Sequence, residues 1–467
     1  MTVGNTLKSN TEFCALKLNP LLVRTLSELG FNKMTPIQKE ALPLILDGKD
    51  ILAQAKTGSG KTAAFGLGIL DHLDVKRFRV QSLILCPTRE LADQVAKELR
   101  RFARGIHNIK ILTLCGGVAI GPQIGSLEHG AHIIVGTPGR ILDHLNKGRL
   151  NLDNVKQFVL DEADRMLEMG FTDALDDINR FMPSVKQTLL FSATFPESVA
   201  QIARDSMNNP VSVKIEDQQN SLSIEQTFYS VTDSETRQTA VKTLLLQEQP
   251  ESAVVFCNTK RETQEMADYL EVVGFNVKAL HGDLDQRQRD QALALFSLKC
   301  ITILVATDVA ARGLDIDSLD LVVNYQLAHD PDTHIHRIGR TGRAGEKGAA
   351  LSLVGPKDET KLALLEERIG IQTLCPIPKD NLPNHSVCQA SMSCIRIEAG
   401  KKQKLRPGDI LGALTAGKDI SGKNVGKIQI HDIWAYVAVE RALAKLALEK
   451  INNGKMKGKS FHARIMS

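Results

Sequence analysis

Residues 55–62 read Ala55-Lys56-Thr57-Gly58-Ser59-Gly60-Lys61-Thr62, a run of small residues that ends in lysine and threonine. This pattern is typical of a phosphate-binding loop, because small residues let backbone N–H groups close around phosphate oxygens. We expect Lys61 to reach the β- and γ-phosphates of ATP and the hydroxyl of Thr62 to bind Mg²⁺. The loop therefore predicts nucleotide binding within an α/β fold.

A second feature is an apolar run that ends in adjacent acids, Val159-Leu160-Asp161-Glu162-Ala163-Asp164. An enzyme that hydrolyses a nucleotide needs one acid to hold the metal and another to activate water. We assign Asp161 to Mg²⁺, through water, and Glu162 to the attacking water. Two adjacent acids are also found in solvated turns, but acids that end an apolar strand face the ligand crevice of an open α/β sheet.

Length and composition favour a soluble protein of several domains. The 467 residues exceed one compact domain, and the contents of 43% hydrophobic and 24% charged residues are ordinary for globular proteins. The eight cysteines include no C-x-x-C pair, and several lie in apolar runs, which predicts reduced, buried thiols. No apolar run approaches the roughly 20 residues that span a bilayer, and residues 1–10 lack a signal-peptide core. We therefore expect a cytoplasmic protein.

The positive charge is concentrated at the C-terminus. Residues 390–467 hold 15 Lys and Arg against 6 Asp and Glu, a net charge of +9, so the remainder is −5 because the whole chain is +4. A basic segment on a mildly acidic body suggests nucleic-acid binding. The alternative is a solvated basic surface without a ligand.

Short apolar runs alternate with helical stretches through most of the chain, which predicts parallel sheets covered on both faces. We expect two such lobes, residues 1–215 and 225–373, joined by a polar linker, residues 216–224. A second linker, residues 374–389, is predicted from its prolines. Residues 390–467 have the order βαββαβ, the layout of RNA-recognition domains, with a small sheet and helices on one face.

Several further motifs occur in a fixed order with the two already described. They are Pro87-Thr88-Arg89-Glu90-Leu91, Thr137-Pro138-Gly139-Arg140, Ser192-Ala193-Thr194, Gln286-Arg287-Gln288-Arg289, Ala311-Arg312-Gly313-Leu314-Asp315 and His336-Arg337-Ile338-Gly339-Arg340-Thr341-Gly342-Arg343. With them, residues 12–370 resemble DEAD-box RNA helicases, and the basic tail is similar to that of a bacterial branch of this family. The resemblance implies two tandem RecA-like lobes, ATP and Mg²⁺ as cofactors, and RNA-dependent ATP hydrolysis.

The resemblance also implies roles at the nucleotide. Phe31 would stack on adenine and Gln38 would pair with its edge, since an amide offers both a donor and an acceptor. Arg340 and Arg343 would act as arginine fingers that neutralise the transferring phosphoryl group. Ser192 and Thr194 resemble residues that couple the two lobes, and His336 fits the inter-lobe network of the family.

RNA contacts of the two lobes are implied in the same way. The first lobe would use Thr88, Arg89, Gly116, Gly117, Thr137, Gly139 and Arg140, and the second would use Arg289 and Thr307, with Gly313 and Asp315 at the nucleotide or the RNA. Glycine lets a phosphate approach the backbone, and threonine can donate from its hydroxyl. Such contacts read strand geometry and 2′-hydroxyls rather than bases.

Two interpretations of the tail remain open. Trp434 and Tyr436 are two residues apart, so they share one sheet face and could stack on bases. The match to an RNA-recognition motif is partial, however, because Asp432 and Ile433 replace its basic residue and glycine. The alternative is that Trp434 packs locally while basic residues grip the phosphates of a hairpin; these are Lys401, Lys402, Lys404, Arg406, Lys455, Lys457 and Lys459.

Three functions fit these patterns. The first is an RNA helicase that unwinds short duplexes and is tethered by its tail; resemblance to the bacterial branch implies a peptidyl-transferase-region hairpin of large-subunit (23S) ribosomal RNA and a role in large-subunit assembly. The second is an ATP-dependent RNA clamp that does not unwind. The third, a DNA-directed motor, is disfavoured by the recognition-type tail and the motif set.

Overall fold

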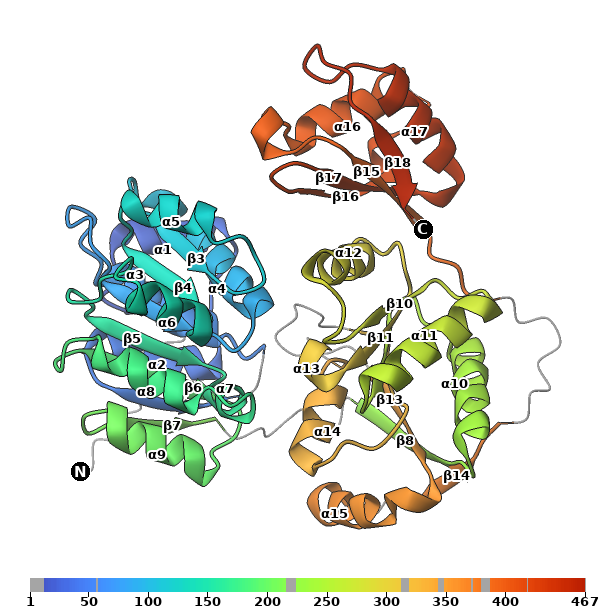
Figure 1. Cartoon of the computed structure of the whole chain (residues 1–467), viewed down its shortest axis with the longest axis horizontal. Helices are drawn as coiled ribbons and strands as arrows, with labels where there is room; N and C mark the ends of the chain where they lie inside the picture. The colour runs from blue at the N-terminus through green and yellow to red at the C-terminus, as the bar shows by residue number, and fades with distance from the viewer. Residues whose placement is uncertain are drawn as a thin grey trace, which may run out of the picture. The chain divides into compact units, whose positions relative to one another are not determined.

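The computed structural model describes residues 12–55, 58–215, 224–311, 319–342, 348–370, 373–378, 387–417 and 419–466. They form two seven-stranded sheets and one four-stranded sheet (Figure 1). One compact unit holds the first sheet, and a second unit holds the other two. The predicted fold, two RecA-like lobes followed by a small α+β domain, is confirmed.

The first lobe is a parallel sheet in the order β3-β4-β2-β5-β6-β1-β7. Its strands are β1 (Ile51–Gln54), β2 (Ser82–Leu85), β3 (Ile111–Leu114), β4 (Ile133–Gly136), β5 (Gln157–Asp161), β6 (Gln187–Ser192) and β7 (Val211–Lys214). Its helices are α1 (Pro20–Glu28), α2 (Pro36–Leu46), α3 (Lys61–Asp71), α4 (Arg89–Phe102), α5 (Gly121–Glu128), α6 (Pro138–Asn146), α7 (Ala163–Glu168), α8 (Thr172–Arg180) and α9 (Glu197–Ser206).

Separate hydrophobic clusters lie on the two faces of this sheet, and every residue of β2, β4 and β5 is buried. Burial on both faces explains why these strands are continuous apolar runs in the sequence. The helices begin where the sequence supplies caps. For example, α4 starts at Arg89 because the Thr88 hydroxyl accepts the Leu91 N–H at 3.3 Å.

The second lobe repeats this plan in the order β10-β11-β9-β12-β13-β8-β14. Its strands are β8 (Ile224–Ser230), β9 (Ala253–Cys257), β10 (Val277–Leu280), β11 (Ile303–Thr307), β12 (Leu321–Asn324), β13 (Gly348–Val354) and β14 (Leu374–Pro376). Its helices are α10 (Ser234–Glu248), α11 (Lys260–Val273), α12 (Gln286–Ser297), α13 (Asp308–Ala311), α14 (Pro331–Ile338) and α15 (Glu359–Ile369).

The bounds of the linkers differ in part from the sequence prediction. The prolines near residue 376 suggested an irregular segment from Leu374 onward, but β14 pairs with β8 there. β14 is the last strand of the sheet, and proline is tolerated on an edge strand because one side needs no hydrogen bonds. Of the first predicted linker, residues 216–223 lie outside the described residues, and Ile224 already belongs to β8.

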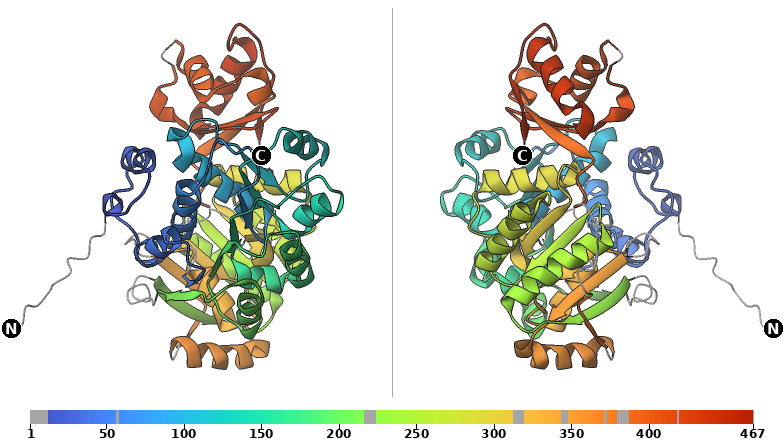
Figure 2. Two further views of the ribbon diagram at one scale, coloured as in Figure 1. Left: turned by 90° about the vertical axis from the view of Figure 1, so that its left-hand side faces the viewer. Right: turned by 90° about the vertical axis from the view of Figure 1, so that its right-hand side faces the viewer.

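The C-terminal domain, residues 387–466, is an antiparallel sheet in the order β16-β17-β15-β18. Its elements are β15 (Met392–Ile397), α16 (Pro407–Thr415), β16 (Val425–Ile430), β17 (Ala435–Glu440), α17 (Ala444–Asn453) and β18 (Ala463–Met466). Both helices lie on one face of this sheet (Figure 2) and share its hydrophobic core. The predicted βαββαβ order is therefore confirmed. Within the described parts of the chain, no helix is both long and apolar enough to cross a membrane.

Candidate nucleotide and RNA sites

The strand order of the first lobe divides the carboxyl edge of its sheet into two halves. All strands are parallel, so the loops that follow them leave from the same edge. Neighbouring β5, β6 and β1 lead into the acids, the Ser192 turn and the phosphate loop. Neighbouring β3, β4 and β2 lead into the predicted RNA contacts. The fold thus gathers the two predicted sites from segments far apart in sequence.

The phosphate loop depends on glycine at Gly60. This residue has φ +93°, and a Cβ placed there would lie 2.4 Å from Nε2 of Gln38. Lys61 is buried, and its Nζ donates to the Ala55 carbonyl at 3.0 Å. Lys61 and Thr62 begin α3, so the N-terminal N–H groups of this helix are available for phosphate. Lys56 and Thr57 lie outside the described residues.

The predicted adenine-binding residues, Phe31 and Gln38, both have partners within the protein, and Gln38 contacts the phosphate loop. Oε1 of Gln38 accepts the Thr35 N–H at 2.9 Å, and Nε2 donates to the Gly60 carbonyl at 3.1 Å. The amide therefore holds the loop in place. Its oxygen keeps a second lone pair and its nitrogen a second N–H, so pairing with adenine stays a prediction. The ring of Phe31 packs edge-on against Phe102 at 5.6 Å.

Asp161 ends β5 as a buried carboxylate that is 3% exposed. Its Oδ1 has no hydrogen-bond partner among the described residues. Burial raises the pKa of Asp161 to about 7, although the positive charge of Lys61 lowers it. A buried carboxylate oxygen without a partner fits a divalent cation, and Mg²⁺ prefers oxygen ligands. The residues expected to hold Mg²⁺ therefore suit it.

Glu162 has backbone angles of φ 54° and ψ 54°, in the left-handed region that few residues other than glycine adopt. This conformation turns the chain sharply from β5 into α7, which begins at Ala163. The carboxylate of Glu162 is buried beside Arg165, with Oε2 3.9 Å from Nε. A strained, enclosed acid at the end of a parallel strand agrees with the predicted catalytic position.

Asp164 connects the acid motif to the Ser192–Thr194 segment, a role that sequence reasoning did not assign. Its Oδ2 accepts both the N–H of Thr194 at 2.9 Å and the Thr194 hydroxyl at 2.8 Å. Oγ of Ser192 accepts the N–H of Asp164 at 3.3 Å. Burial alone would raise the pKa of Asp164, but these hydrogen bonds lower it. The only sequence signal was its fourth place in the acid motif.

The predicted RNA contacts of the first lobe lie on three adjacent loops. The Thr137 hydroxyl accepts the Gly116 N–H at 3.3 Å, so the loops after β3 and β4 are joined directly. Arg140 donates to the Val118 carbonyl at 3.2 Å. Gly117 has φ +74°, and Cβ atoms at Gly116 or Gly139 would meet nothing within 4 Å. The open space beside these glycines suits the approach of a phosphate.

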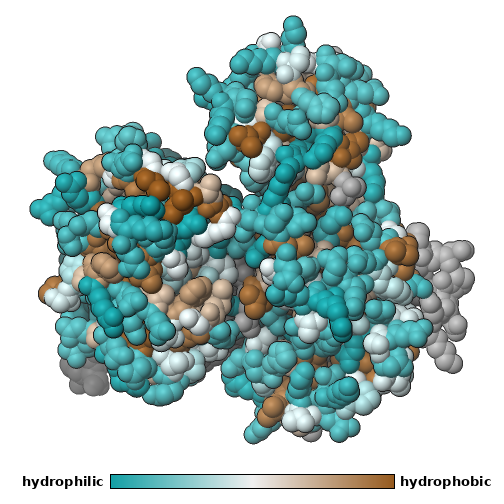
Figure 3. All heavy atoms as spheres, viewed as in Figure 1, coloured by the Kyte–Doolittle hydropathy of each residue, from teal (hydrophilic) through white to brown (hydrophobic). Residues whose placement is uncertain are grey.

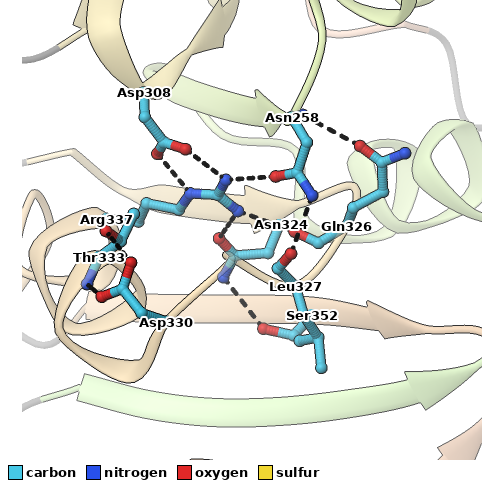
Figure 4. Close-up of polar contacts among 9 residues, drawn as sticks. All are labelled: Asn258, Asp308, Asn324, Gln326, Leu327, Asp330, Thr333, Arg337 and Ser352. Atoms are coloured by element: carbon cyan, nitrogen blue, oxygen red, sulfur yellow. Dashed lines mark hydrogen bonds and ion pairs between the residues drawn. The ribbon is translucent and has the colours of Figure 1, made fainter. Parts of the chain in front are cut away.

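In the second lobe, Arg337 lies at the centre of a polar cluster that sequence reasoning did not single out (Figure 4). It is 2% exposed and pairs with Asp308 through Nε at 2.6 Å and Nη2 at 2.7 Å. Its Nη2 also donates to Asn258 Oδ1 at 2.7 Å, and its Nη1 donates to the Gln326 carbonyl at 2.7 Å. Arg337 thus ties α14 to the ends of β9, β11 and β12.

Some of the other predicted residues of the second lobe are neighbours of this cluster in sequence, Arg289 lies on a different helix, and the rest lie outside the described parts. His336 is half-buried on α14, Arg340 follows that helix and is buried, and Thr307 ends β11. Arg289 lies in the first turn and a half of α12. Gly313, Asp315 and Arg343 lie outside the described residues.

The aromatic residues of the C-terminal domain share one sheet face, as their spacing predicted. The guanidinium of Arg396 lies 5.1 Å from the Trp434 ring centre, and His431 packs edge-on against Tyr436 at 5.6 Å. Tyr436 is only 4% exposed, so its ring is covered in this structure. The structure therefore leaves no open face of Tyr436 for a base.

The predicted basic residues of this domain are exposed and lie on loops that touch one another. Lys457 Nζ donates to the Lys404 carbonyl at 2.6 Å and pairs with Asp409 at 3.0 Å. The backbone of Lys401 donates to the His431 carbonyl at 2.8 Å. The visible face of the domain, at the top of Figure 3, is mostly hydrophilic. One end of the domain therefore gathers the lysines and Arg406 into a basic loop cluster, which comprises Lys401, Lys402, Lys404, Arg406, Lys455, Lys457 and Lys459.

Comparisons with known families match all three parts of the chain. A DEAD/DEAH box helicase profile matches residues 35–202, and a helicase conserved C-terminal domain profile matches residues 236–345. A DbpA RNA binding domain profile matches residues 394–465.

Individual relatives match most or all of the chain. The ATP-dependent RNA helicase DbpA of Escherichia coli K12 is 50% identical over 457 residues, 98% of this chain and 100% of its own. The ATP-dependent RNA helicase CshA of Listeria monocytogenes is 45% identical over 76% of this chain and 68% of its own. Among solved structures, S. cerevisiae Dbp5 bound to RNA and ADP BeF3 gives a TM-score of 0.71 at 34% identity, covering 79% of this chain and 96% of its own.

Proposed function

The chain belongs to the DEAD-box ATP-dependent RNA helicases, and from this premise we propose that it acts on large-subunit ribosomal RNA during assembly of the large ribosomal subunit. ATP is its substrate and RNA its partner. In the proposal, the C-terminal domain holds a hairpin of the peptidyl-transferase region while the lobes separate a nearby short duplex. The observation that carries the proposal is the DbpA-type RNA binding domain, with its exposed basic loop cluster.

The ATP chemistry is assigned to residues at the carboxyl edge of the first sheet. The N-terminal turn of α3 and Lys61 bind the phosphates, and Glu162 orients water and takes its proton. Asp161, with Thr62, would hold Mg²⁺, which neutralises phosphate charge when it is bound. Arg340 and Arg343 of the second lobe would stabilise the charge that develops on the phosphoryl group.

The exposure of the Tyr436 ring and of the basic side chains decides which of the two interpretations of the tail we propose. Because Tyr436 is covered, base stacking on this sheet is not the recognition mode that we propose. The basic loop cluster is exposed, and lysine recognises phosphate as a point charge without reading sequence. We therefore propose that the basic loop cluster binds the phosphate backbone of a folded RNA hairpin. All eight cysteines are free thiols, which supports a cytoplasmic site of action.

Binding of the full-length protein to the ribosomal hairpin tests this assignment. Changing Lys402, Lys455 and Lys459 together to glutamate should weaken binding by at least about tenfold and flatten its salt dependence. The matched control is Lys445→Glu, an exposed lysine on α17 outside the cluster, which should have little effect. Equal affinity of the triple variant and the wild type would contradict the assignment. Duplex separation on RNA and DNA substrates then distinguishes unwinding from a clamp and from a DNA motor.

A further inference from the structure

Two buried polar side chains of the first lobe connect its helices to one of the predicted RNA loops. His144 of α6 is 0% exposed, and Gln123 of α5 is 8% exposed. Nε2 of His144 lies 3.3 Å from Oε1 of Gln123, and Nε2 of Gln123 donates to the Cys115 carbonyl at 3.0 Å. Cys115 directly precedes Gly116 and Gly117. A chain of hydrogen bonds therefore leads from α6 through α5 to the loop after β3.

The chemistry of the three groups fixes the direction of these hydrogen bonds. A carbonyl oxygen can only accept, so the amide nitrogen of Gln123 faces Cys115 and the amide oxygen faces His144. Nε2 of His144 therefore carries the hydrogen and donates it to Gln123. Burial lowers the pKa of His144, and the positive charge of Arg140 lowers it further, so the ring is neutral at pH 7. Among the described residues, Nδ1 of this ring is buried without a partner.

The loop after β3 is held at both sides of a single peptide group, the one between Cys115 and Gly116. Gln123 binds the carbonyl of this group, and the Thr137 hydroxyl accepts its N–H at 3.3 Å. Thr137 is the N-cap residue of α6 and His144 lies further along the same helix, so α6 fixes the N–H side directly and the carbonyl side through Gln123. The glycines that follow have no side chains to pack, so the loop depends on these polar contacts for its conformation.

We propose that Gln123 and His144 are positioning residues for RNA binding, which hold the Cys115–Gly116 peptide group in the orientation that receives a phosphate of the RNA backbone. Both side chains are buried, so they act through the loop and not by touching RNA. A loop that is already ordered loses less conformational freedom when RNA binds, and its affinity for RNA is higher for that reason. The role rests on the proposed assignment of RNA contacts to the loops after β3 and β4.

ATP hydrolysis by the full-length protein, measured over a range of RNA concentrations, tests this role. His144→Phe keeps a buried ring but cannot donate to Gln123, so the RNA concentration for half-maximal stimulation should rise about five- to tenfold. Turnover at saturating RNA should stay within about twofold of the wild type. His144→Gln keeps an N–H donor and should recover most of the lost affinity. Gln123→Leu should weaken RNA binding as much as His144→Phe, and combining the two should add little, because His144 acts through Gln123.

A second buried histidine supplies the matched control. His132 is also 0% exposed, but it lies at the opposite edge of the sheet, where its Nδ1 accepts the Lys110 N–H at 3.1 Å. His132→Phe should lower stability to urea about as much as His144→Phe and leave the half-maximal RNA concentration unchanged. An equal rise in His132→Phe would mean that His144 only stabilises the fold.

Arg140→Ala separates the positioning role from the assignment on which it rests. Arg140 is a predicted direct contact, so its loss should raise the half-maximal RNA concentration whatever His144 does. If Arg140→Ala raised this concentration and His144→Phe did not, the positioning role alone would be wrong. If neither variant raised it, the assignment of RNA to these loops would be wrong, and the positioning role with it.

Discussion

At the scale of single residues, the catalytic prediction concerns Glu162. Glu162→Gln keeps the shape of the side chain but removes the base, so RNA-stimulated ATP turnover should fall by at least about 100-fold. RNA binding through the C-terminal domain should be unchanged, because Glu162 lies in the first lobe. Steady-state phosphate release and hairpin binding, measured on the same preparation, check both parts. If the variant kept its ATP turnover, Glu162 would not be the catalytic base.

The polar cluster around Arg337 leads to a prediction about the stability of the second lobe. Replacing Arg337 with methionine leaves Asp308, a half-buried acid whose side chain is 15% exposed, without its main partner, which should lower the free energy of unfolding of the second lobe by about 3 kcal/mol. Arg368→Met is the control, because that arginine is 62% exposed and 3.7 Å from Asp332. Its loss should cost under about 1 kcal/mol. Urea unfolding measures both variants, and similar costs would show that the buried cluster contributes little.

His334 makes stability depend on pH. It is buried against Phe228, has no hydrogen-bond partner among the described residues, and burial lowers its pKa to about 4 from an ordinary 6.5. The unfolded chain therefore binds the proton more readily, and stability is lost as pH falls from 6.5 toward 4, by about 3 kcal/mol. His334→Phe should lose this part of the pH dependence. Identical stability profiles for both proteins would contradict the assignment.

At the scale of elements, substitution of Gly60 tests why the phosphate loop needs glycine at this position. Gly60→Ala would force a Cβ to 2.4 Å from Gln38 Nε2 at φ +93°, so the loop must deform and ATP affinity should fall at least about tenfold. Gly48 is the matched control: its φ is +74°, but a Cβ there meets nothing within 4 Å. Gly48→Ala should cost about 1–2 kcal/mol of stability and leave ATP affinity unchanged. A fluorescent nucleotide titration distinguishes the two.

Elements were predictable where one physical signal dominates. Buried parallel strands such as β2 and β9 are continuous apolar runs, and Thr88 and Thr259 cap the helices that follow them. The β14 strand was not predicted, because proline is a signal against strands and only the edge position permits it.

The candidate sites were predictable as motifs but not as contacts. The sequence could not show that the amide of Gln38 is bound within the protein, or that Asp164 receives the hydrogen bonds of Thr194. Nor could it show that Tyr436 is covered. Each of these facts depends on residues that only the tertiary fold brings together.

At the scale of the whole molecule, the C-terminal domain should select the RNA while the lobes supply the chemistry. Removing residues 390–467 should leave ATP binding intact, because the phosphate loop and the acids belong to a separate compact unit. The preference for the ribosomal hairpin should disappear, since the basic loop cluster is lost. Competition binding against unrelated RNA measures this preference. An unchanged preference would place RNA selection in the lobes.

The most direct test of the account is ATP hydrolysis by the full-length protein under three conditions: without RNA, with bulk non-ribosomal RNA, and with a ribosomal fragment that contains the peptidyl-transferase hairpin. We predict strong stimulation by the ribosomal fragment alone. Equal stimulation by any RNA would contradict the central claim and leave a general DEAD-box helicase whose tail is a nonspecific basic anchor.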